Sequence, residues 1–236
     1  MPSKKRPPLV NSEIYHIVIR TVEDLKLFRD DHDFLRMIHD LFAFNDTVPV
    51  SSYFRRDKVT GTFPATFMKR KREVLVEILA FCLMSNHVHL LVRQLKDDGI
   101  SNFMRKIGAG YSAYYNQKYK RAGHVFQGRY KIVHITNDNQ LKTIFVYIHT
   151  NPVAIIYPHW KEEGIGIKYL GKVIQFIEEY RWSSYSDYLG NKNFPSLTFR
   201  EWLMGEIGGI NECRRFINDW LETKKDLADL DKIAIN

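Results

Sequence analysis

Cysteine is almost absent from this sequence: its 236 residues contain only two, Cys82 and Cys213. Two cysteines so far apart cannot form a disulfide framework or a cysteine-rich metal site. No apolar run approaches the roughly 18 residues that would indicate a membrane span. The first ten residues, MPSKKRPPLV, carry a basic cluster without the apolar segment and cleavage site of a secretory signal. These absences argue against a secreted scaffold, a membrane protein and a zinc finger, and we expect a soluble, cytoplasmic protein.

Acidic residues are missing from one long stretch, between Asp98 and Asp138. The whole chain has 35 Lys and Arg against 27 Asp and Glu, which gives a net charge of +8 and an isoelectric point near 9.3. Such an excess of positive charge favours an acidic partner. A second basic cluster, in residues 55–72, flanks a loop with glycine and proline.

Basic and aromatic residues alternate within the acid-free stretch. The basic residues are Arg105, Lys106, Lys118, Lys120, Arg121, Arg129 and Lys131. The aromatic residues between them are Phe103, Tyr111, Tyr114, Tyr115, Tyr119, Phe126 and Tyr130. Positive side chains neutralise phosphates and flat rings offer stacking faces, so the pattern predicts a surface for single-stranded nucleic acid. The alternative is that the charges form a solvated face and that several of the tyrosines belong to the core.

The apolar spacing predicts a series of strands and helices. Residues 13–21 alternate as a strand does, and residues 23–44 have helical spacing. Two apolar runs, 74–84 and 87–94, are separated only by Ser85 and Asn86 and are typical of a tight hairpin. A helix over 100–120, a strand over 128–136 and a helix over 138–150 follow, the last one capped by Asn137 or Asp138 and stopped before Pro152.

This order, β-α-β-β-α-β followed by a helix, predicts an α+β fold. It is the ferredoxin-like arrangement, an antiparallel sheet with helices on one face. Beyond Pro152 the pattern weakens, with a turn and short helix at 182–190 and two small helices within 198–223. We therefore predict one domain over residues 1–190 and a C-terminal helical extension over residues 191–236.

The first candidate for chemistry is His87-Val88-His89. Alternate residues of a strand share a face, so the two imidazoles would project side by side, as two ligands of one metal ion do. Imidazole suits Zn, Mn, Fe or Cu, whereas Mg²⁺ prefers oxygen, so the spacing leaves the metal open. The alternative is a pair of half-buried strand histidines with no ligand.

The second candidate is Tyr147 with Asn151, one helical turn later on the same face. Leu141, Ile144 and Ile148 form the apolar stripe of this helix, and Tyr147 lies off it. A tyrosine hydroxyl is a covalent nucleophile when a metal or base assists it, and an amide oxygen is a ligand for a hard ion. The alternative is a packing tyrosine and a helix cap before proline.

Four runs of sequence resemble one known family. FCLMSNHVHLLV, AGHVFQGRYK, YIHTNPV and RWSSYSDYLG occur in the same order in the IS200/IS605-like Y1 (HUH) transposases, and the sequence looks closest to their REP-associated tyrosine transposases. The resemblance covers about residues 10–190 and implies an RRM-like sheet. Two departures are Ser85, where the family usually has proline, and Ala154, where a basic residue usually follows Asn-Pro-Val.

The resemblance also implies a reaction. In the family, two histidines and a polar residue hold Mg²⁺ or Mn²⁺, and these positions match His87, His89 and Asn151. The nucleophile matches Tyr147, which would attack a phosphodiester of single-stranded DNA near a hairpin and keep a 5′-phosphotyrosine link for strand transfer. Members of the family include dimers in which the tyrosine helix completes the partner's site, so monomer and homodimer both stay open.

Two other functions are compatible with the sequence. One is a domesticated protein that binds DNA hairpins without cutting them. The other is a metal enzyme for small molecules, which would leave the stretch of basic and aromatic residues unexplained.

Overall fold

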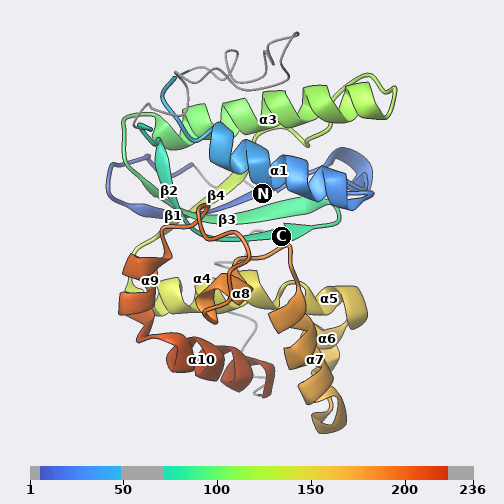
Figure 1. Cartoon of the computed structure of the whole chain (residues 1–236), viewed down its shortest axis with the longest axis vertical. Helices are drawn as coiled ribbons and strands as arrows, with labels where there is room; N and C mark the ends of the chain where they lie inside the picture. Colours follow the sequence, from blue (N-terminus) through green and yellow to red (C-terminus); the bar gives the residue numbers. More distant parts are fainter. Residues whose placement is uncertain (1–5, 49–71, 223–236) are drawn as a thin grey trace.

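A four-stranded antiparallel sheet forms the centre of the computed structural model, which describes residues 6–48 and 72–222 (Figure 1). The strands are β1 (Ile14–Arg20), β2 (Val76–Met84), β3 (His87–Gln94) and β4 (Lys131–Ile135), in the order β2-β3-β1-β4. This is the ferredoxin-like order, and the predicted α+β fold is confirmed. Of the second basic cluster, residues 55–71 lie outside the described residues.

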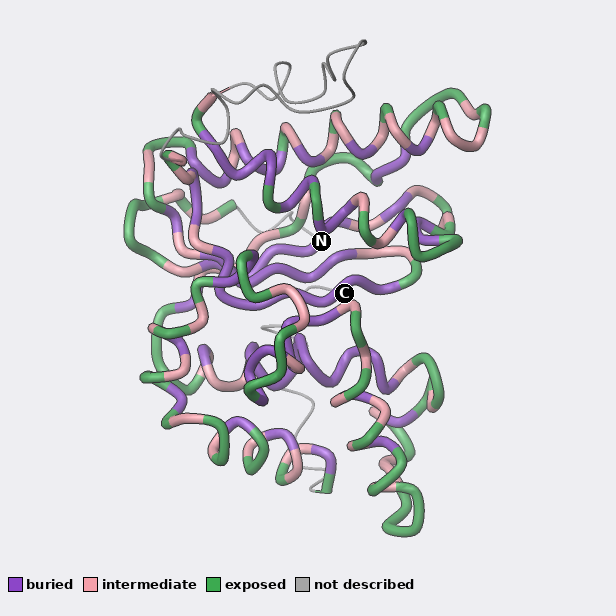
Figure 2. The backbone as a smooth tube through the Cα atoms, viewed as in Figure 1, coloured by how far each residue is buried: buried purple, intermediate pink, exposed green. Residues whose placement is uncertain are grey.

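Two helices cover one face of the sheet, α1 (Asp31–Ala43) and α3 (Gly99–Lys118). Figure 2 shows their buried sides turned to the strands, and Tyr15, Ile17 and Leu90 share a core with them. The helix predicted from residue 23 begins only at Asp31. Residues Val22–Asp24 instead form a short 3-10 helix, η1, and the Asp30 side chain caps α1 by accepting a hydrogen bond from the backbone N–H of Asp33.

Gly110 allows α1 and α3 to approach closely. A Cβ atom at this position would lie 2.3 Å from a ring carbon of Phe44, just after α1. Glycine destabilises the helix by about 1 kcal/mol relative to alanine, but here it permits the tight packing of the two helices.

Further helices cover the opposite face, so the expectation of helices on one face only was wrong. The largest contributor is α4 (Asp138–Thr150), which packs on β2 and β3. The reason lies in the strands: β1, β2 and β3 are buried on both faces, so each face needs an apolar cover. The other helices on this side are α5 (Val153–Ile156), α6 (Trp160–Glu163), α7 (Ile167–Glu179), α8 (Tyr185–Tyr188), α9 (Arg200–Ile207) and α10 (Ile210–Glu222).

The C-terminal helices belong to the same core as α4. α10 packs on α4 and α9 packs on β2, and Leu203, Ile217 and Leu221 share a buried cluster with Phe145. The boundary at residue 190 stays a prediction. Within the described ranges, no helix combines the length and apolarity needed to cross a membrane.

Candidate active site

The two histidines of β3 lie on the face of the sheet that α4 covers. Their ring centroids are 4.8 Å apart. Leu91, which shares their face by the strand alternation, belongs to the core around α4. His87 is partly exposed and His89 is only 1% exposed. The predicted side-by-side arrangement is therefore present in the structure.

Asn86 orients the ring of His87. The Asn86 amide nitrogen donates to the Asp24 carboxylate at 2.8 Å, which turns the amide oxygen towards His87 Nδ1 at 2.6 Å. An amide oxygen only accepts, so Nδ1 of His87 carries the proton and donates. The lone pair of His87 is thereby left on Nε2, in the tautomer that a metal ligand of this kind uses.

His16 of β1, which the sequence reasoning missed, contacts His89. His16 Nε2 and His89 Nδ1 are 3.1 Å apart, and the two rings stack with centroids 5.3 Å apart. His89 Nε2 is buried and has no hydrogen-bond partner among the described residues. With His89 Nδ1 as the donor to His16, this buried Nε2 keeps a lone pair with nothing to bind it. Strand alternation alone could place His16 on a face, but only the pairing of β1 with β3 brings it to His89.

Burial keeps both histidines of β3 uncharged at neutral pH. Removal from water lowers the pKa of His87 to about 4, with smaller contributions from the nearby cations Arg20 and Lys161. The pKa of His89 lies well below its usual range, again mainly through burial. Neutral imidazoles are the form that coordinates metal ions.

Tyr147 projects from α4 to the same histidines. Its ring centroid lies 5.5 Å from that of His89 and 5.9 Å from that of His16, both nearly perpendicular. The helix has the predicted bounds, and Asn137 caps it by accepting from Gln140 N–H. Although Tyr147 is off the predicted apolar stripe, it is only 2% exposed, because its ring packs against His16 and His89 of the sheet.

Asn151 follows Tyr147 at the end of α4. Its amide nitrogen donates to the backbone carbonyl of Tyr147 at 2.7 Å, and the residue is 7% exposed. The amide oxygen is thus the group that Asn151 can offer to an ion. Of the four residues predicted for the reaction, His89 thus contacts both His87 and Tyr147, and Asn151 contacts the backbone of Tyr147.

Three cations surround this group. Lys161 Nζ lies 4.7 Å from the centroid of the Tyr147 ring, and Arg20 pairs with His87 across β1 and β3. Lys131, one of the predicted DNA contacts, pairs with Val18 on the next row of the same face. Burial lowers the pKa of Lys131, and the charge of Arg20 lowers it further. The arrangement suits an anion beside Tyr147.

Arg105 and Arg129, two other predicted DNA contacts, are far apart in the sequence but line the same cavity in the structure. Both line a cavity of about 560 Å³ together with Arg6, whose guanidinium lies 4.1 Å from the centroid of the Tyr130 ring. No Asp or Glu lines this cavity, and none of the three arginines makes an ion pair with a described residue. We call it the arginine cavity.

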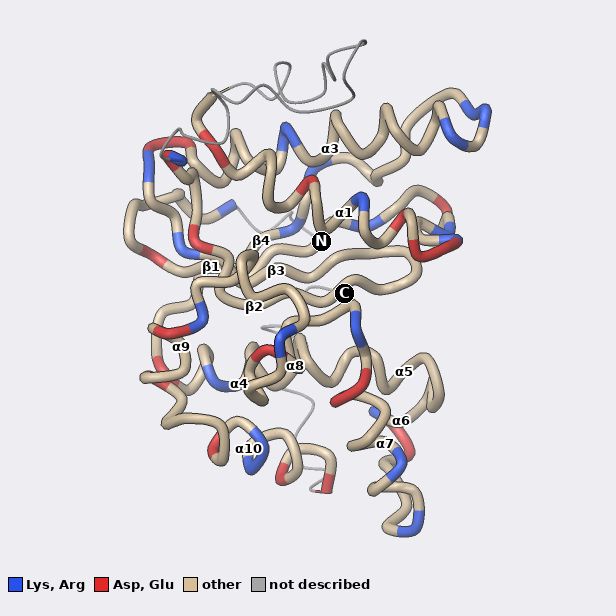
Figure 3. The backbone as a smooth tube through the Cα atoms, in the orientation of Figure 1, with Lys and Arg blue, Asp and Glu red and all other residues tan. Residues whose placement is uncertain are grey.

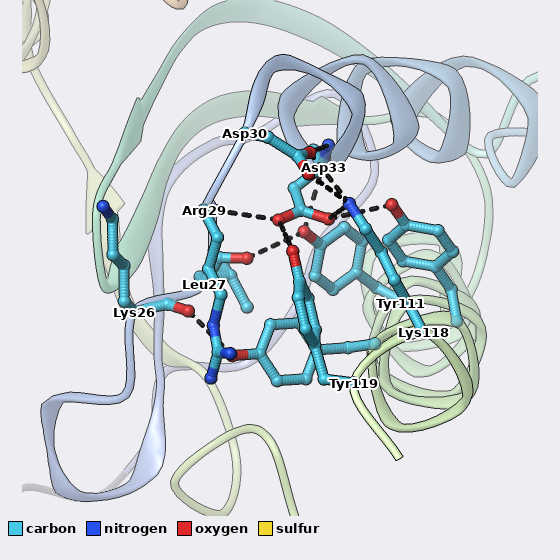
Figure 4. A network of polar contacts seen from close by, with 10 residues as sticks. Lys26, Leu27, Arg29, Asp30, Asp33, Tyr111, Lys118 and Tyr119 are labelled. Atoms are coloured by element: carbon cyan, nitrogen blue, oxygen red, sulfur yellow. Dashed lines mark hydrogen bonds and ion pairs between the residues drawn. The ribbon is translucent and has the colours of Figure 1, made fainter. Parts of the chain in front are cut away.

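The remaining predicted contacts differ in their surroundings. Lys106 donates to the carbonyl oxygens of residues 46 and 48, and Arg121 donates to Asn116 and to a backbone carbonyl. Lys118 is held by the carboxylates of Asp30 and Asp33 (Figure 4). Lys120, two residues after the end of α3, is exposed. Figure 3 shows the basic positions of α3 at two separate places along the helix.

Most rings of the acid-free stretch are part of the core and offer no stacking face. Tyr111 and Tyr115 are 0% exposed, and their hydroxyls donate to backbone carbonyls near the start of α1. Tyr114 and Tyr119 bind Asp33. For these tyrosines the core alternative is the one that the structure supports.

Within residues 6–48 and 72–222, no cluster of three or more His, Cys, Asp or Glu side chains is arranged to hold an ion. The ligand set that the resemblance implies, two histidines with the amide of Asn151, is of a different kind and stays a prediction.

Comparison with known proteins agrees with this geometry. The family model described as "Transposase IS200 like" matches residues 51–151, a segment that contains His87, His89, Tyr147 and Asn151. Over this segment the chain is similar to the IS200-like transposases, which agrees with the resemblance noted in the sequence.

Among solved structures, the chain is similar to a REP-associated tyrosine transposase bound to a REP hairpin. The two share 15% identity with a TM-score of 0.50, over 82% of this chain and 89% of the other. The likeness shows a common fold. A candidate transposase from Deinococcus radiodurans R1 aligns with a TM-score of 0.34 and 16% identity, over 61% of this chain and 95% of that one. No curated protein matches the sequence significantly.

Proposed function

We propose that the protein is a metal-dependent nuclease and strand transferase for single-stranded DNA at sites next to hairpins. Its nucleophile is Tyr147, and its covalent intermediate is a 5′-phosphotyrosine. The observation that carries this proposal is the contact between the rings of Tyr147 and His89, whose centroids lie 5.5 Å apart within one chain. The fold shared with a hairpin-bound tyrosine transposase supports the choice of DNA.

The residues present fit a divalent ion. His87 and His89 each have Nε2 as the nitrogen left for coordination, and the buried Nε2 of His89 lacks any other partner among the described residues. Asn151 would add its amide oxygen. Mn²⁺ accepts both imidazole and oxygen ligands, and Mg²⁺ is the other candidate. A bound ion would polarise the scissile phosphate as a Lewis acid.

In this reaction the oxygen of Tyr147 forms a bond to phosphorus while the bond from phosphorus to the 3′ oxygen breaks. The phenol loses its proton to solvent and the departing 3′ oxygen gains one, so a free 3′-OH results. Lys161 and Arg20 lie where they would stabilise the negative charge of the reacting phosphate. Attack by another 3′-OH on the phosphotyrosine reverses the step and joins a new strand.

The test is a covalent adduct. Wild-type protein with hairpin-bearing single-stranded DNA and Mn²⁺ should give a protein–DNA species that survives denaturing electrophoresis and releases a 3′-OH. Tyr147→Phe should abolish the adduct and keep DNA binding, whereas Tyr157→Phe, a tyrosine outside the site, should keep both. An adduct of equal yield in Tyr147→Phe would disprove the assignment of the nucleophile.

The second candidate function is a hairpin-binding protein that does not cut. The observation in its favour is the burial of Tyr147, which is 2% exposed and lies beneath Lys161. Hairpin binding by the wild type with no adduct in Mn²⁺ or Mg²⁺ would favour this function over the nuclease.

A further inference from the structure

A second cavity opens directly beside the candidate active site. Its volume is about 630 Å³, within the range of about 300–1,000 Å³ that is usual for ligand pockets. Four parts of the chain surround it: the segment leading into α1 with the start of that helix, the turn between β2 and β3, α5, and the segment directly after α7, which contributes Tyr180 and Trp182. His87 is one of its lining residues, so the cavity and the proposed metal site share a wall.

The walls of this cavity are mainly apolar. Phe34 stacks between Phe28 and Trp182, with ring centroids 4.3 Å and 4.4 Å away, and the three rings form one side. Ile155 of α5 lines another part and is 50% exposed. Ala154 lines the cavity beside it, so this part of the wall carries no charge.

Charges of both signs line this cavity. They are two basic residues, Lys26 and Arg29, and two acidic residues, Asp30 and Asp31, of which Asp30 also pairs with Lys118. The arginine cavity differs, because three arginines and no acidic residue line it. A phosphate would therefore be favoured in the arginine cavity over this one, whereas an uncharged, planar group suits apolar walls with a polar rim.

We propose that this cavity, the base pocket, holds the nucleobase of the nucleotide adjacent to the scissile phosphate. The base pocket would make the protein itself select the base at the cut. The wall shared at His87, the apolar rings and the presence of charges of both signs at the cavity support this assignment. It rests on the proposed function, since it is that function which puts a nucleotide at His87.

Two neighbouring isoleucines allow a matched test. Ile155 lines the base pocket, whereas Ile156 is 39% exposed and does not. Ile155→Asp should place a carboxylate in the pocket, and Ile156→Asp puts the same charge next to it. Both side chains are exposed, so both variants should fold like the wild type. Ile155→Ala, which adds no charge, separates loss of the apolar wall from repulsion.

The experiment uses single-stranded DNA with a fixed hairpin and a random eight-nucleotide flank. In one arm the full-length Tyr147→Phe protein, which cannot cut, binds the pool, and the bound DNA is sequenced. In the other arm the wild-type protein, which keeps Tyr147, forms covalent adducts with the DNA in the presence of Mn²⁺, and the DNA in the adducts is sequenced. Each arm is repeated with the additional substitutions Ile155→Asp, Ile155→Ala and Ile156→Asp.

We expect one position of the flank to show a modest base preference, because every base can stack on the rings but the strength of stacking differs among the bases. Ile155→Asp should reduce that preference to near unity, Ile155→Ala should weaken it, and Ile156→Asp should keep it. A preference unchanged in Ile155→Asp, or no preference in either arm, would overturn the base pocket. Preference in the binding arm without any adduct would support the pocket and contradict the nuclease.

Discussion

At the scale of single residues, His16 shows how the candidate site is held. It reaches His89 from a neighbouring strand, with 3.1 Å between their ring nitrogens, and both residues are buried. A hydrogen bond to the far nitrogen of a metal-binding histidine fixes the tautomer and the ring orientation. We therefore assign His16 as a positioning residue for His89.

Replacing His16 should weaken the site without removing a ligand. We expect His16→Leu to lower Mn²⁺ affinity and the rate of adduct formation by about 10- to 100-fold, and His16→Gln, which keeps a hydrogen-bonding amide, to restore part of both. Titration calorimetry with Mn²⁺ and single-turnover cleavage measure the two effects. Equal Mn²⁺ affinity in His16→Leu and wild type would show that His16 only packs.

At the scale of elements, Asp33 joins α1 to α3. Its carboxylate is buried and accepts hydrogen bonds from Lys118 at 2.7 Å, Tyr114 at 2.8 Å and Tyr119 at 2.6 Å, and from the backbone N–H of Arg29 (Figure 4). Burial alone would raise the pKa of Asp33, but these donors outweigh it and lower the pKa below its usual value. Lys118, which the acid-free stretch suggested as a DNA contact, thus stabilises the fold.

This carboxylate should make stability depend on acid. Because its pKa is lower in the folded state, its contribution is complete above the unfolded value near 3.8 and is lost as the pH falls through the folded value. We expect Asp33→Asn to reduce the free energy of unfolding by about 2–4 kcal/mol at pH 7 and by less at low pH. Urea denaturation at both pH values measures this. Asp31→Asn, at an exposed carboxylate nearby, should change stability by less than about 1 kcal/mol.

At the scale of the whole molecule, five of the seven predicted basic contacts fall into two groups. Arg105 and Arg129 line the arginine cavity, whereas Lys106, Lys118 and Arg121 bind the protein's own groups. Net charge alone cannot separate these groups, because each residue contributes equally to it. Their effects on DNA binding should differ.

Salt dependence distinguishes the two groups. Each phosphate contact with single-stranded DNA contributes about 0.7 to the slope of log affinity against log salt. We expect Arg129→Gln to reduce that slope by about this amount and Lys118→Gln to leave it unchanged while lowering the melting temperature. Fluorescence anisotropy with a labelled hairpin oligonucleotide, at several salt concentrations, measures the slope. The same slope in Arg129→Gln and wild type would exclude Arg129 from the DNA interface.

The whole molecule also decides whether one chain suffices. Tyr147 meets His89 within the chain, so no second copy is needed to complete the proposed site. We expect a mixture of Tyr147→Phe and His89→Ala proteins to form no adduct above the level of either alone. Recovery of adduct on mixing would show that the tyrosine helix is exchanged between two protomers.

The sequence by itself predicted the ferredoxin-like arrangement and the bounds of α4, and it named His87, His89, Tyr147 and Asn151 as candidate residues. The helix bounds and the shared face of the two histidines depend on spacing within one element, and the arrangement follows from the order of the elements along the chain. The tertiary structure decided what depends on register and on layers: the pairing that brings His16 to His89, and the cover on the second face of the sheet. It also decided that Arg105 and Arg129 line one cavity while the tyrosines between them fill the core. Local periodicity does not contain these long-range distances, because which apolar face meets which is fixed only when the strands pair and the helices pack.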